Sequence, residues 1–389
     1  MEAGQVSDPR VRVFTCTDVI SYNPGNADRP QRIQVCYEFV KKCFSVEDLP
    51  SVEENLRKAE KLAMRIHKRR YVEYLRDVPK SVPVIPETFY VRDAFNYADA
   101  RRSTPSPLRH HARPEHAGYW IFDSDTPLME DTYETALMSL LCAHSAAEWA
   151  FRRGCGAIAY SLGRSPGHNA SYSVGGGYCL FNNAFTAACT LCEQWKEEAG
   201  IGPIKYIVIV DLDFHHGNGT WSLVQKHGDL PIKCVNIYAD NDLGYEPYFI
   251  EYCIRNHENV DLDFKALDFP IDPQAPNARE EAELFLKKTF MVLSGLLGER
   301  DMLGGVVVSL GLDMHILDDL TGGVLGVDES WYHQAGKTIR EAVEGKCPVV
   351  VVQEGGYDPW SARRCVEAFF RGLAPAPGDS DKGVVAARI

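Results

Sequence analysis

The chain has 389 residues, of which 45% are hydrophobic and 24% are charged, and its formal net charge is −13 at pH 7. This composition is typical of a globular protein with a large core, and the length fits one large α/β domain or two smaller ones. The acidic balance argues against direct binding of nucleic acid, whose phosphates it would repel, and favours cationic partners such as small amines or basic peptide tails.

Neither a membrane segment nor a metal-binding cysteine framework is evident. No stretch approaches the ~20 consecutive apolar residues of a spanning helix, and the N-terminus lacks an apolar signal region, so we expect a cytoplasmic protein, with the nucleus left open. The 12 cysteines are scattered. The one C-x-x-C pair, Cys189 and Cys192, lies in a helical pattern, and no second pair could complete a four-cysteine zinc site. We expect reduced thiols, mostly in the core.

Short apolar, β-branched runs alternate with amphipathic stretches along the chain. The predicted strands cover residues 157–160, 206–210, 234–238, 306–310 and 349–352, and the predicted helices cover 134–152, 183–198, 278–297 and 328–344. Strands that are apolar at nearly every position are typical of parallel sheets covered on both faces. The alternation therefore predicts an α/β fold with a mainly parallel sheet and helices on both faces, and ligands bind at the carboxyl ends of such strands.

We expect one domain over residues 10–373, with an inserted loop region at 80–127 and a flexible tail at 374–389. The inserted region is rich in proline and contains a cluster of basic residues, namely Arg101, Arg102, Arg109, His110, His111, Arg113 and His116. It is interpreted as a lid or an oligomer contact. A solvated loop without function is the alternative.

The strongest local signal is the segment Val210–Gly219, with the sequence VDLDFHHGNG. It begins as a strand and is broken by two glycines. Asp211, Asp213 and His215 alternate, so within a strand their side chains would share one face. Polar groups at the end of a buried strand need a partner that offsets the cost of burial, and a divalent cation supplies one.

A second strand end contributes Asp313, in the segment SLGLDMH after the strand at 306–310. One imidazole and two carboxylates, from His215, Asp213 and Asp313, leave coordination positions open for water and substrate. That arrangement is typical of a catalytic rather than a structural zinc site. A hydrogen-bonded cluster of the same side chains without a metal is the alternative.

Two further motifs follow predicted strands. The segment RSPGHNA at 164–170 is followed by GGGYCLFNN at 175–183. Its three glycines permit positive φ and close backbone approach, so the loop with Gly177 could line a narrow passage that has Tyr178 as an aromatic wall. The segment QEGGY places Tyr357 on a glycine turn at a strand end, where its phenol could hydrogen-bond a substrate oxygen. A plain turn and a packing tyrosine are the alternatives.

In this order, the motifs resemble those of the histone deacetylase and acetylpolyamine amidohydrolase superfamily, and the resemblance covers about residues 29–373. It implies a single arginase/deacetylase-type α/β domain. It also implies one zinc ion held by Asp213, His215 and Asp313, which would activate water and polarise the amide carbonyl. A structural K⁺ ion behind the zinc, near Asp211 and Asp213, is left open by the same resemblance.

The resemblance assigns roles to further residues. Tyr357 would hydrogen-bond the developing oxyanion. Asp211 would orient His168, the first histidine of a tandem pair, and Tyr178 would form a wall of the acyl-lysine channel.

The closer likeness is to the acetylpolyamine branch. The sequence GYW at 118–120, followed by DSDTP at 123–127, resembles a segment of that branch in which an acidic residue near the entrance meets the distal ammonium groups of a polyamine. Asp125 has the matching position, and the stretch Tyr245–Phe249 also resembles those enzymes. The likeness implies a small cationic N-acetylated substrate and a homodimer, in which the loop at 80–127 narrows the partner's active-site mouth.

One residue departs from the family pattern. The family reads PGHHA where this chain reads PGHNA, so Asn169 replaces the histidine that usually serves as general base. An asparagine can orient water, but it cannot take a proton near neutral pH. The sequence thus predicts a zinc-dependent deacetylase of small N-acetylated amines such as acetylpolyamines, impaired by Asn169. The alternatives are a homologue that binds such ligands without hydrolysing them, and a protein lysine deacetylase.

Overall fold

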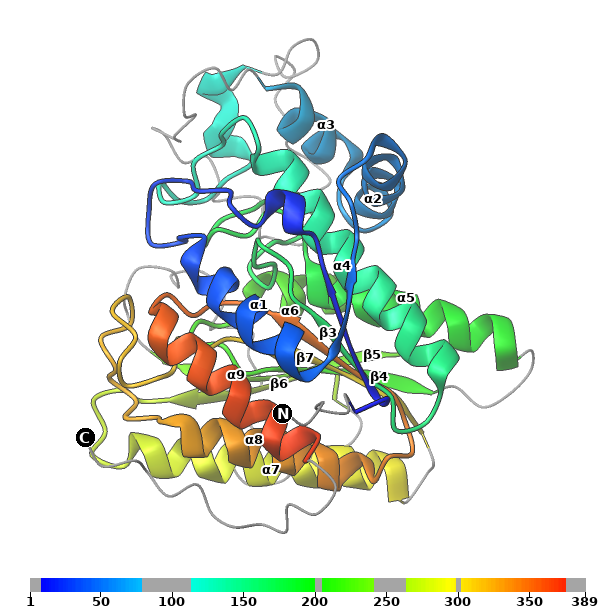
Figure 1. Cartoon of the computed structure of the whole chain (residues 1–389), viewed down its shortest axis with the longest axis vertical. Coiled ribbons are helices and arrows are strands. Elements are labelled where there is room, and N and C mark those ends of the chain that lie inside the picture. Colours follow the sequence, from blue (N-terminus) through cyan, green and yellow to red (C-terminus); the bar gives the residue numbers. More distant parts are fainter. Residues whose placement is uncertain (1–7, 79–112, 200–204, 241–263, 299–301, 376–389) are drawn as a thin grey trace, which may run out of the picture.

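The computed structural model describes residues 8–78, 113–199, 205–240, 264–298 and 302–375, and these residues form one sheet of eight parallel strands (Figure 1). The order across the sheet is β2-β1-β3-β8-β7-β4-β5-β6, and every pairing is parallel. The predicted fold class is confirmed. The strands are β1 (Val11–Thr15), β2 (Ser45–Asp48), β3 (Ile158–Ser161), β4 (Tyr206–Asp211), β5 (Ile232–Ala239), β6 (Ala266–Ile271), β7 (Leu303–Leu310) and β8 (Val349–Gln353).

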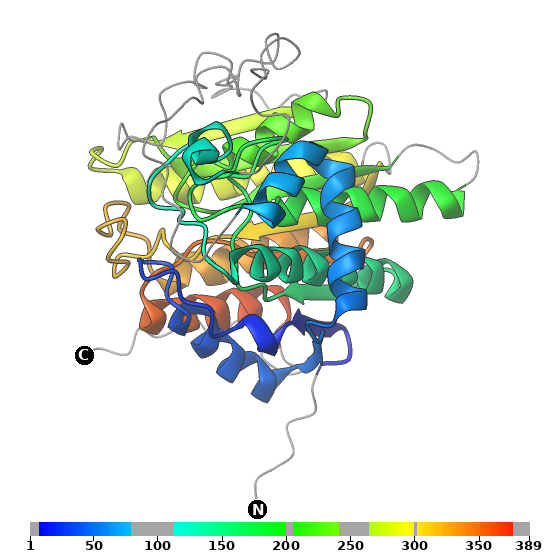
Figure 2. The ribbon, with the colours of Figure 1, turned by 90° about the horizontal axis from the view of Figure 1, so that it is seen from above.

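Helices cover both faces of the sheet. They are α1 (Gln31–Cys43), α2 (Glu53–Ile66), α3 (Arg69–Asp77), α4 (Thr132–Arg153), α5 (Asn183–Ala199), α6 (Asn218–Lys226), α7 (Ala278–Gly298), α8 (Glu329–Val343) and α9 (Pro359–Leu373). One apolar core joins the sheet to α1, α7, α8 and α9, and the other joins it to α2 through α6 (Figures 1 and 2).

Alternate residues of a strand belong to opposite cores. In β4, Val208 and Val210 face the core with α7 to α9, whereas Ile207 and Ile209 face the core with α4 and α5. Successive side chains of a strand point to opposite faces, so a strand covered on both sides must be apolar at consecutive positions. This explains why the central strands could be predicted as uninterrupted apolar runs.

All five predicted strands and all four predicted helices are present, with ends displaced by only a few residues. The prediction missed β1, β2 and β6 and several helices. The edge strand β2 is largely exposed and polar, and β6 contains an aspartate and a proline, so neither has the composition of a buried strand. One detail was wrong: β4 ends at Asp211, so Asp213 and His215 lie in the following loop rather than on a strand face.

The described part of the predicted inserted region, residues 113–127, packs against the domain. It begins with the 3₁₀ helix Pro114–Tyr119, and Trp120 and Ile121 are buried, with the Trp120 ring against Tyr71 and Tyr74 of α3. Residues 80–112 of that region lie outside the described residues, as do the stretch at 245–249 and the tail beyond residue 375. The lid and oligomer interpretations of the inserted region therefore stay predictions.

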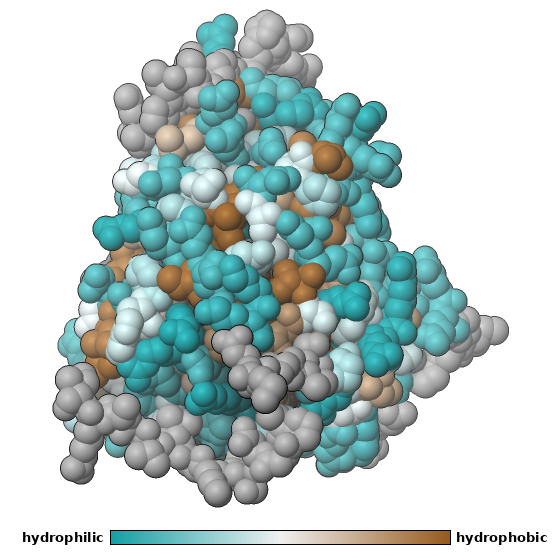
Figure 3. Space-filling model, in the orientation of Figure 1, coloured by the Kyte–Doolittle hydropathy of each residue, from teal (hydrophilic) through white to brown (hydrophobic). Residues whose placement is uncertain are grey.

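The surface and the thiols agree with the composition. Hydrophilic side chains dominate the face seen in Figure 3, and apolar residues appear there only in small separate groups. Within the described ranges, every cysteine is free, and all but a few are buried. None of the helices in those ranges is both long enough and apolar enough to cross a membrane.

The crossing of α8 and α9 gives a test of this packing. A Cβ on Gly336 would overlap the carbonyl oxygen of Phe369, and one on Gly372 would overlap that of His333. We expect Gly336→Ala to lower the free energy of unfolding by about 1–3 kcal/mol, because the helices would have to separate. Gly298→Ala in α7, where a Cβ meets nothing within 4 Å, is the matched control. Urea denaturation measures both, and an unchanged Gly336→Ala variant would contradict the close crossing.

Candidate active site

The motifs singled out in the sequence follow four adjacent strands, at one edge of the sheet. Strands β3, β8, β7 and β4 are neighbours, and their carboxyl ends lead into the segments at 164–170, 354–357, 311–315 and 212–219 respectively. Parallel strands bring their carboxyl ends to the same edge, so four segments that are far apart in the chain meet there.

The three predicted metal ligands converge at this edge. His215 Nδ1 lies 3.2 Å from Asp213 Oδ1 and 3.2 Å from Asp313 Oδ2. One possible ligand atom from each of the three residues lies within 4.8 Å of the other two. Asp313 Oδ1 accepts a hydrogen bond from the backbone of Phe214 at 3.1 Å. Asp313 Oδ2 is buried but makes no hydrogen bond of good geometry, so it is available to a cation.

A glycine allows the loop after β8 to close over this cluster. Gly355 N donates to Asp213 Oδ2 at 2.9 Å. A Cβ at this position would lie 2.5 Å from Asp313 Oδ2 and 2.6 Å from Asp213 Oδ2. Any other residue would therefore push the two carboxylates away from each other or from the loop.

The surroundings raise the pKa of two members of this cluster. Burial raises the pKa of Asp313 to about 7, and the nearby Asp213 carboxylate adds to the effect. Burial lowers the pKa of His215, but the nearby carboxylates of Asp213 and Asp313 outweigh it and raise that pKa to about 9. A divalent ion would reverse both shifts, because its ligands must be deprotonated. The donor set and the orphaned carboxylate oxygen fit such an ion.

A buried amide oxygen lies behind this cluster. Asn236 of β5 is in register with Asp211 of β4, and its Nδ2 donates to Asp268 Oδ1 at 2.7 Å. Its Oδ1 is buried and has no hydrogen-bond donor among the described residues. A buried oxygen without a donor fits an oxygen-coordinated cation beside Asp211, although the predicted K⁺ ion stays a prediction.

His168 is held by a carboxylate, as the resemblance implied. Its Nδ1 lies 3.2 Å from Asp211 Oδ2, and its Nε2 lies 3.6 Å from Asp213 Oδ1. Burial lowers the pKa of His168, but the charges of Asp213 and Asp211 outweigh burial and hold that pKa well above its usual value. These two carboxylates therefore favour the protonated form of His168.

The buried carboxylate of Glu354, which was not a predicted site residue, fixes the backbone at His168. Glu354 Oε2 accepts from the N–H groups of Gly167 and His168 at 2.6 and 3.1 Å. Burial raises its pKa to about 7. Cys179 also lies near Glu354 and His168, and burial raises the pKa of its thiol.

Asn169 has an uncharged partner. Its Nδ2 donates to His216 O at 3.0 Å and to Asn218 Oδ1 at 3.1 Å. A Cβ on Gly177 would lie 2.5 Å from Asn169 Oδ1, so the glycine loop closes directly onto this amide. His168 thus faces a carboxylate and Asn169 faces another amide. Asn218 lies within the segment Val210–Gly219 but was not a predicted site residue, because only the fold shows which side chain reaches Asn169.

Two tyrosines face each other beside the metal cluster. The ring centroids of Tyr178 and Tyr357 are 5.6 Å apart, the ring planes are inclined at 64°, and both side chains are only partly exposed. Tyr178 has a φ of 65°, which is rare for a residue with a side chain and indicates a constrained loop. Burial, followed by the charge of Asp313, raises the pKa of Tyr357. Its phenol therefore keeps its proton and can donate a hydrogen bond.

The segment at 123–126 supports the glycine loop, and its two aspartates have different roles. Asp123 Oδ2 accepts from Gly177 N at 2.5 Å, and Thr126 Oγ1 accepts from Tyr178 N at 2.9 Å. Asp125 is exposed and, after burial, is the largest cause of the raised pKa of Tyr178, so it lies close to that phenol. Neither aspartate caps a helix, since α4 begins only at Thr132.

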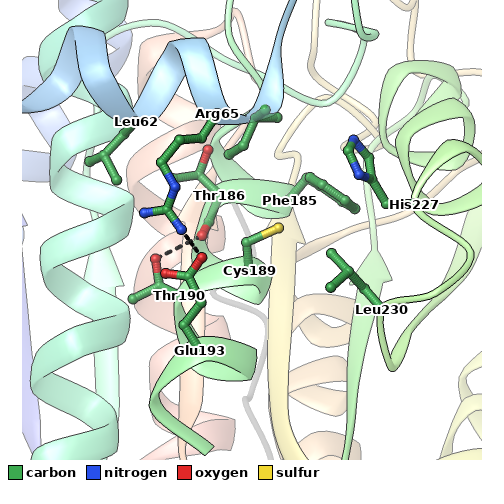
Figure 4. A pocket seen from close by; sticks show the side chains of 10 residues that line it. Leu62, Arg65, Phe185, Thr186, Cys189, Thr190, Glu193, His227 and Leu230 are labelled. Carbon is green, nitrogen blue, oxygen red and sulfur yellow. Dashed lines mark hydrogen bonds and ion pairs between the residues drawn. The ribbon is translucent and has the colours of Figure 1, made fainter. Parts of the chain in front are cut away.

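A separate pocket under α2 shares no residue with this site (Figure 4). It has a volume of about 110 Å³. Its two charged groups, Arg65 of α2 and Glu193 of α5, form an ion pair with each other. The hydroxyl of Thr190 donates to the carbonyl of Thr186 at 2.9 Å. His227 also lines the pocket, and its buried Nε2 has no hydrogen-bond partner among the described residues.

Comparison with known proteins agrees with this geometry. Residues 26–373 match the family described as "Histone deacetylase domain". The acetylpolyamine amidohydrolase of Mycoplana ramosa is 32% identical over 241 residues, or 62% of this chain and 63% of that protein. The alignment thus spans less than two thirds of that relative. A probable deacetylase of Methanothermobacter thermautotrophicus is 33% identical over 259 residues, or 66% of this chain and 69% of that protein.

The fold is shared with solved structures. An acetylpolyamine aminohydrolase from Burkholderia pseudomallei superposes with a TM-score of 0.68 at 21% identity, over 94% of this chain and 99% of that one. The family match covers most of the chain, and the matched residues include the converging ligands, the His168–Asp211 pair and Tyr357. The chain therefore belongs to the histone deacetylase family.

Proposed function

We propose that this chain binds zinc and hydrolyses small N-acetylated amines, such as acetylpolyamines, with turnover slowed by Asn169. The observation that carries this proposal is the convergence of Asp213, His215 and Asp313 next to the His168–Asp211 pair and Tyr357. The names of the similar proteins, which include acetylpolyamine amidohydrolases, support the reaction and the substrate class.

Asp213, His215 and Asp313 would hold the metal ion. One imidazole and two carboxylates leave coordination positions for water and for a substrate carbonyl. When bound there, zinc supplies Lewis-acid polarisation of the amide carbonyl and lowers the pKa of a water molecule.

The surrounding side chains divide the remaining work. The Tyr357 phenol, held in its neutral form, donates a hydrogen bond to the carbonyl oxygen as negative charge develops on it. His168, held as a cation by Asp211, can protonate the departing amine nitrogen from Nε2. Tyr178 and the backbone of Gly177 line the approach to these groups.

Among the residues that the structure describes, no dedicated proton acceptor for the attacking water lies beside Asn169. Asn169 and Asn218 are amides, and neither binds a proton near neutral pH. General base catalysis is worth about 10²–10⁴-fold in rate. The same pair favours a second candidate, a homologue that binds zinc and the ligand but does not turn it over.

Substrate charge is the remaining element of the proposal. Asp125 is exposed beside Tyr178, and its backbone is fixed because its carbonyl accepts a hydrogen bond from Asn26 at 2.7 Å. A carboxylate beside Tyr178 suits a substrate that has an acetamide at one end and an ammonium group further along. A protein lysine deacetylase would not need that second charge.

Zinc binding should depend on both carboxylates and on pH. We expect about one zinc ion per chain by elemental analysis, and at least a hundredfold weaker binding in Asp213→Ala and Asp313→Ala, since even outer partners of a metal site cost about 10–100-fold. His215 and Asp313 hold protons below pKa values of about 9 and 7, so binding should release protons and weaken as the pH falls. Titration calorimetry in buffers of different ionisation enthalpy measures this, with Asp229→Ala as an exposed control. Equal binding by all variants would refute the site.

Turnover should respond to the Asn169–Asn218 pair as a unit. In Asn169→His alone, the new imidazole would face the Asn218 amide and would lack a carboxylate to stabilise its protonated form. We expect little gain from that variant and at least about a 10²-fold rise in kcat from Asn169→His combined with Asn218→Asp, in line with the worth of a general base. Zinc content and ligand affinity should change little.

The Asn218→Asp single variant is the matched control, because it adds the carboxylate without the imidazole. High turnover by the unaltered chain would show that His168 or another group accepts the proton. No gain in the double variant, with zinc bound, would favour the binding-only candidate.

Asp125 should contribute to affinity for cationic substrates only. We expect Asp125→Asn to weaken binding of an N-acetylated diamine about two- to fivefold at low salt, the size of an exposed charge pair, and to leave a neutral N-alkyl acetamide unaffected. The difference should shrink with added salt. Glu130→Gln, a nearby exposed change, is the control. Equal losses for both ligands would contradict a charge-recognition role.

A further inference from the structure

A carboxylate outside the metal cluster holds the backbone that carries Tyr357. Asp318 Oδ2 accepts hydrogen bonds from Tyr357 N at 2.6 Å and from Asp358 N at 3.2 Å, and its Oδ1 accepts from Leu320 N at 3.0 Å. The residue is only 1% exposed. Hydrogen bonds from backbone N–H groups to a carboxylate are stronger than those between neutral groups, and they offset the cost of burying it.

Asp318 belongs to the loop that also carries a metal ligand. This loop follows β7, which ends at Leu310, and contains Asp313; within it Asp318 N donates to His315 O at 2.9 Å. Thr321 Oγ1 donates to the carbonyl oxygen of Asp313 at 2.7 Å. The loop is therefore folded onto itself, and the position of the Asp318 carboxylate is tied to that of Asp313.

The buried side chain of Arg32 binds carbonyl groups of the same turn that carries Tyr357. Arg32 Nε donates to Gly356 O at 2.8 Å, and its Nη2 contacts Glu354 O. The guanidinium carbon lies 5.4 Å from the centre of the Tyr357 ring. Carbonyl groups on one side of the turn and N–H groups on the other are thus both bound, which leaves the turn few alternative conformations.

We propose that Asp318 is a positioning residue that fixes the Tyr357 turn relative to Asp313, so that the phenol faces the metal cluster. The hydrogen bonds of the Asp318 carboxylate are to backbone N–H groups, and not to the side chains of the candidate metal ligands or of Tyr178. It acts through the backbone N–H of Tyr357. The catalytic part of this inference rests on the proposed function, whereas the backbone part does not.

Amide hydrogen exchange tests the backbone part without any ligand. In the unaltered protein, we expect the amides of Tyr357 and Asp358 to be protected although they lie in a loop. In Asp318→Asn they should exchange at least about tenfold faster, because the substituted side chain presents an N–H where an acceptor is needed. Asp319→Asn, the same change at the exposed neighbouring position, should leave them unchanged. Unprotected amides in the unaltered protein, or equal exchange in both variants, would overturn the proposal.

A double-mutant cycle tests the action through Tyr357. The probe is an alkyl trifluoromethyl ketone with a terminal amine, whose hydrate mimics the tetrahedral species of amide hydrolysis, bound to zinc-loaded protein. We expect Asp318→Asn to weaken its binding about tenfold, part of the loss expected from removing an oxyanion donor, and to weaken a ground-state N-alkyl acetamide much less. In a Tyr357→Phe background, Asp318→Asn should have no further effect. Zinc content should be unchanged throughout.

The outcomes distinguish failure of the proposed role of Asp318 from failure of the proposed function. An equal loss in both backgrounds would overturn the proposal, because Asp318 would then act by some route other than Tyr357. If the unaltered protein bound neither zinc nor the ketone, the proposed function would fail, and the exchange rates of the two amides would still decide whether Asp318 holds the turn.

Discussion

Asp211, Asp213 and Asp313 carry carboxylates into a part of the molecule where none of the three residues is more than 1% exposed. Each buried charge is costly unless hydrogen-bond donors, a cationic side chain or a metal ion compensates it. The donors that do so come from different segments: Gly355 N from the loop after β8, and His168 from the loop after β3. Compensation of these charges therefore requires the loops to meet, and the site forms together with the fold.

The loops are joined to one another chiefly by buried polar bridges. Glu354 holds the backbone before His168, Asp123 holds Gly177, and Arg32 binds carbonyl groups on both sides of Gly355. Such bridges specify direction as well as distance, which apolar packing does not. If the site works as proposed, the phenol, the imidazole and the three candidate ligands must keep a fixed relation, and polar bridges support this better than a larger apolar core would.

The uncharged pair of Asn169 and Asn218 explains how binding and turnover could be separated in this family. An imidazolium with its carboxylate has no net charge, and neither has a pair of amides, so either pair would present a similar overall field to a cation bound at the proposed site. The amide pair retains hydrogen-bonding groups, with Asn169 Nδ2 bound to His216 O and Asn218 Oδ1. What it cannot do is change its protonation state, and that capacity matters only when a bond is broken.

The parallel α/β class and the central strands could be predicted from the sequence, because strands covered on both faces must be apolar throughout. The sequence also marked Asp213, His215 and Asp313 as candidate metal ligands, because polar side chains at the ends of buried strands need partners, and the fold brings these three together. The edge strand β2 and the proline-containing β6 were missed, since their stability comes from neighbours rather than from their own composition. The sequence also marked Asn169 as a departure. Only the tertiary structure decided that its partner is Asn218 and that Asp318 holds the Tyr357 turn. Those contacts join segments that are distant in the chain, and local sequence patterns contain no information about which side chains meet across such distances.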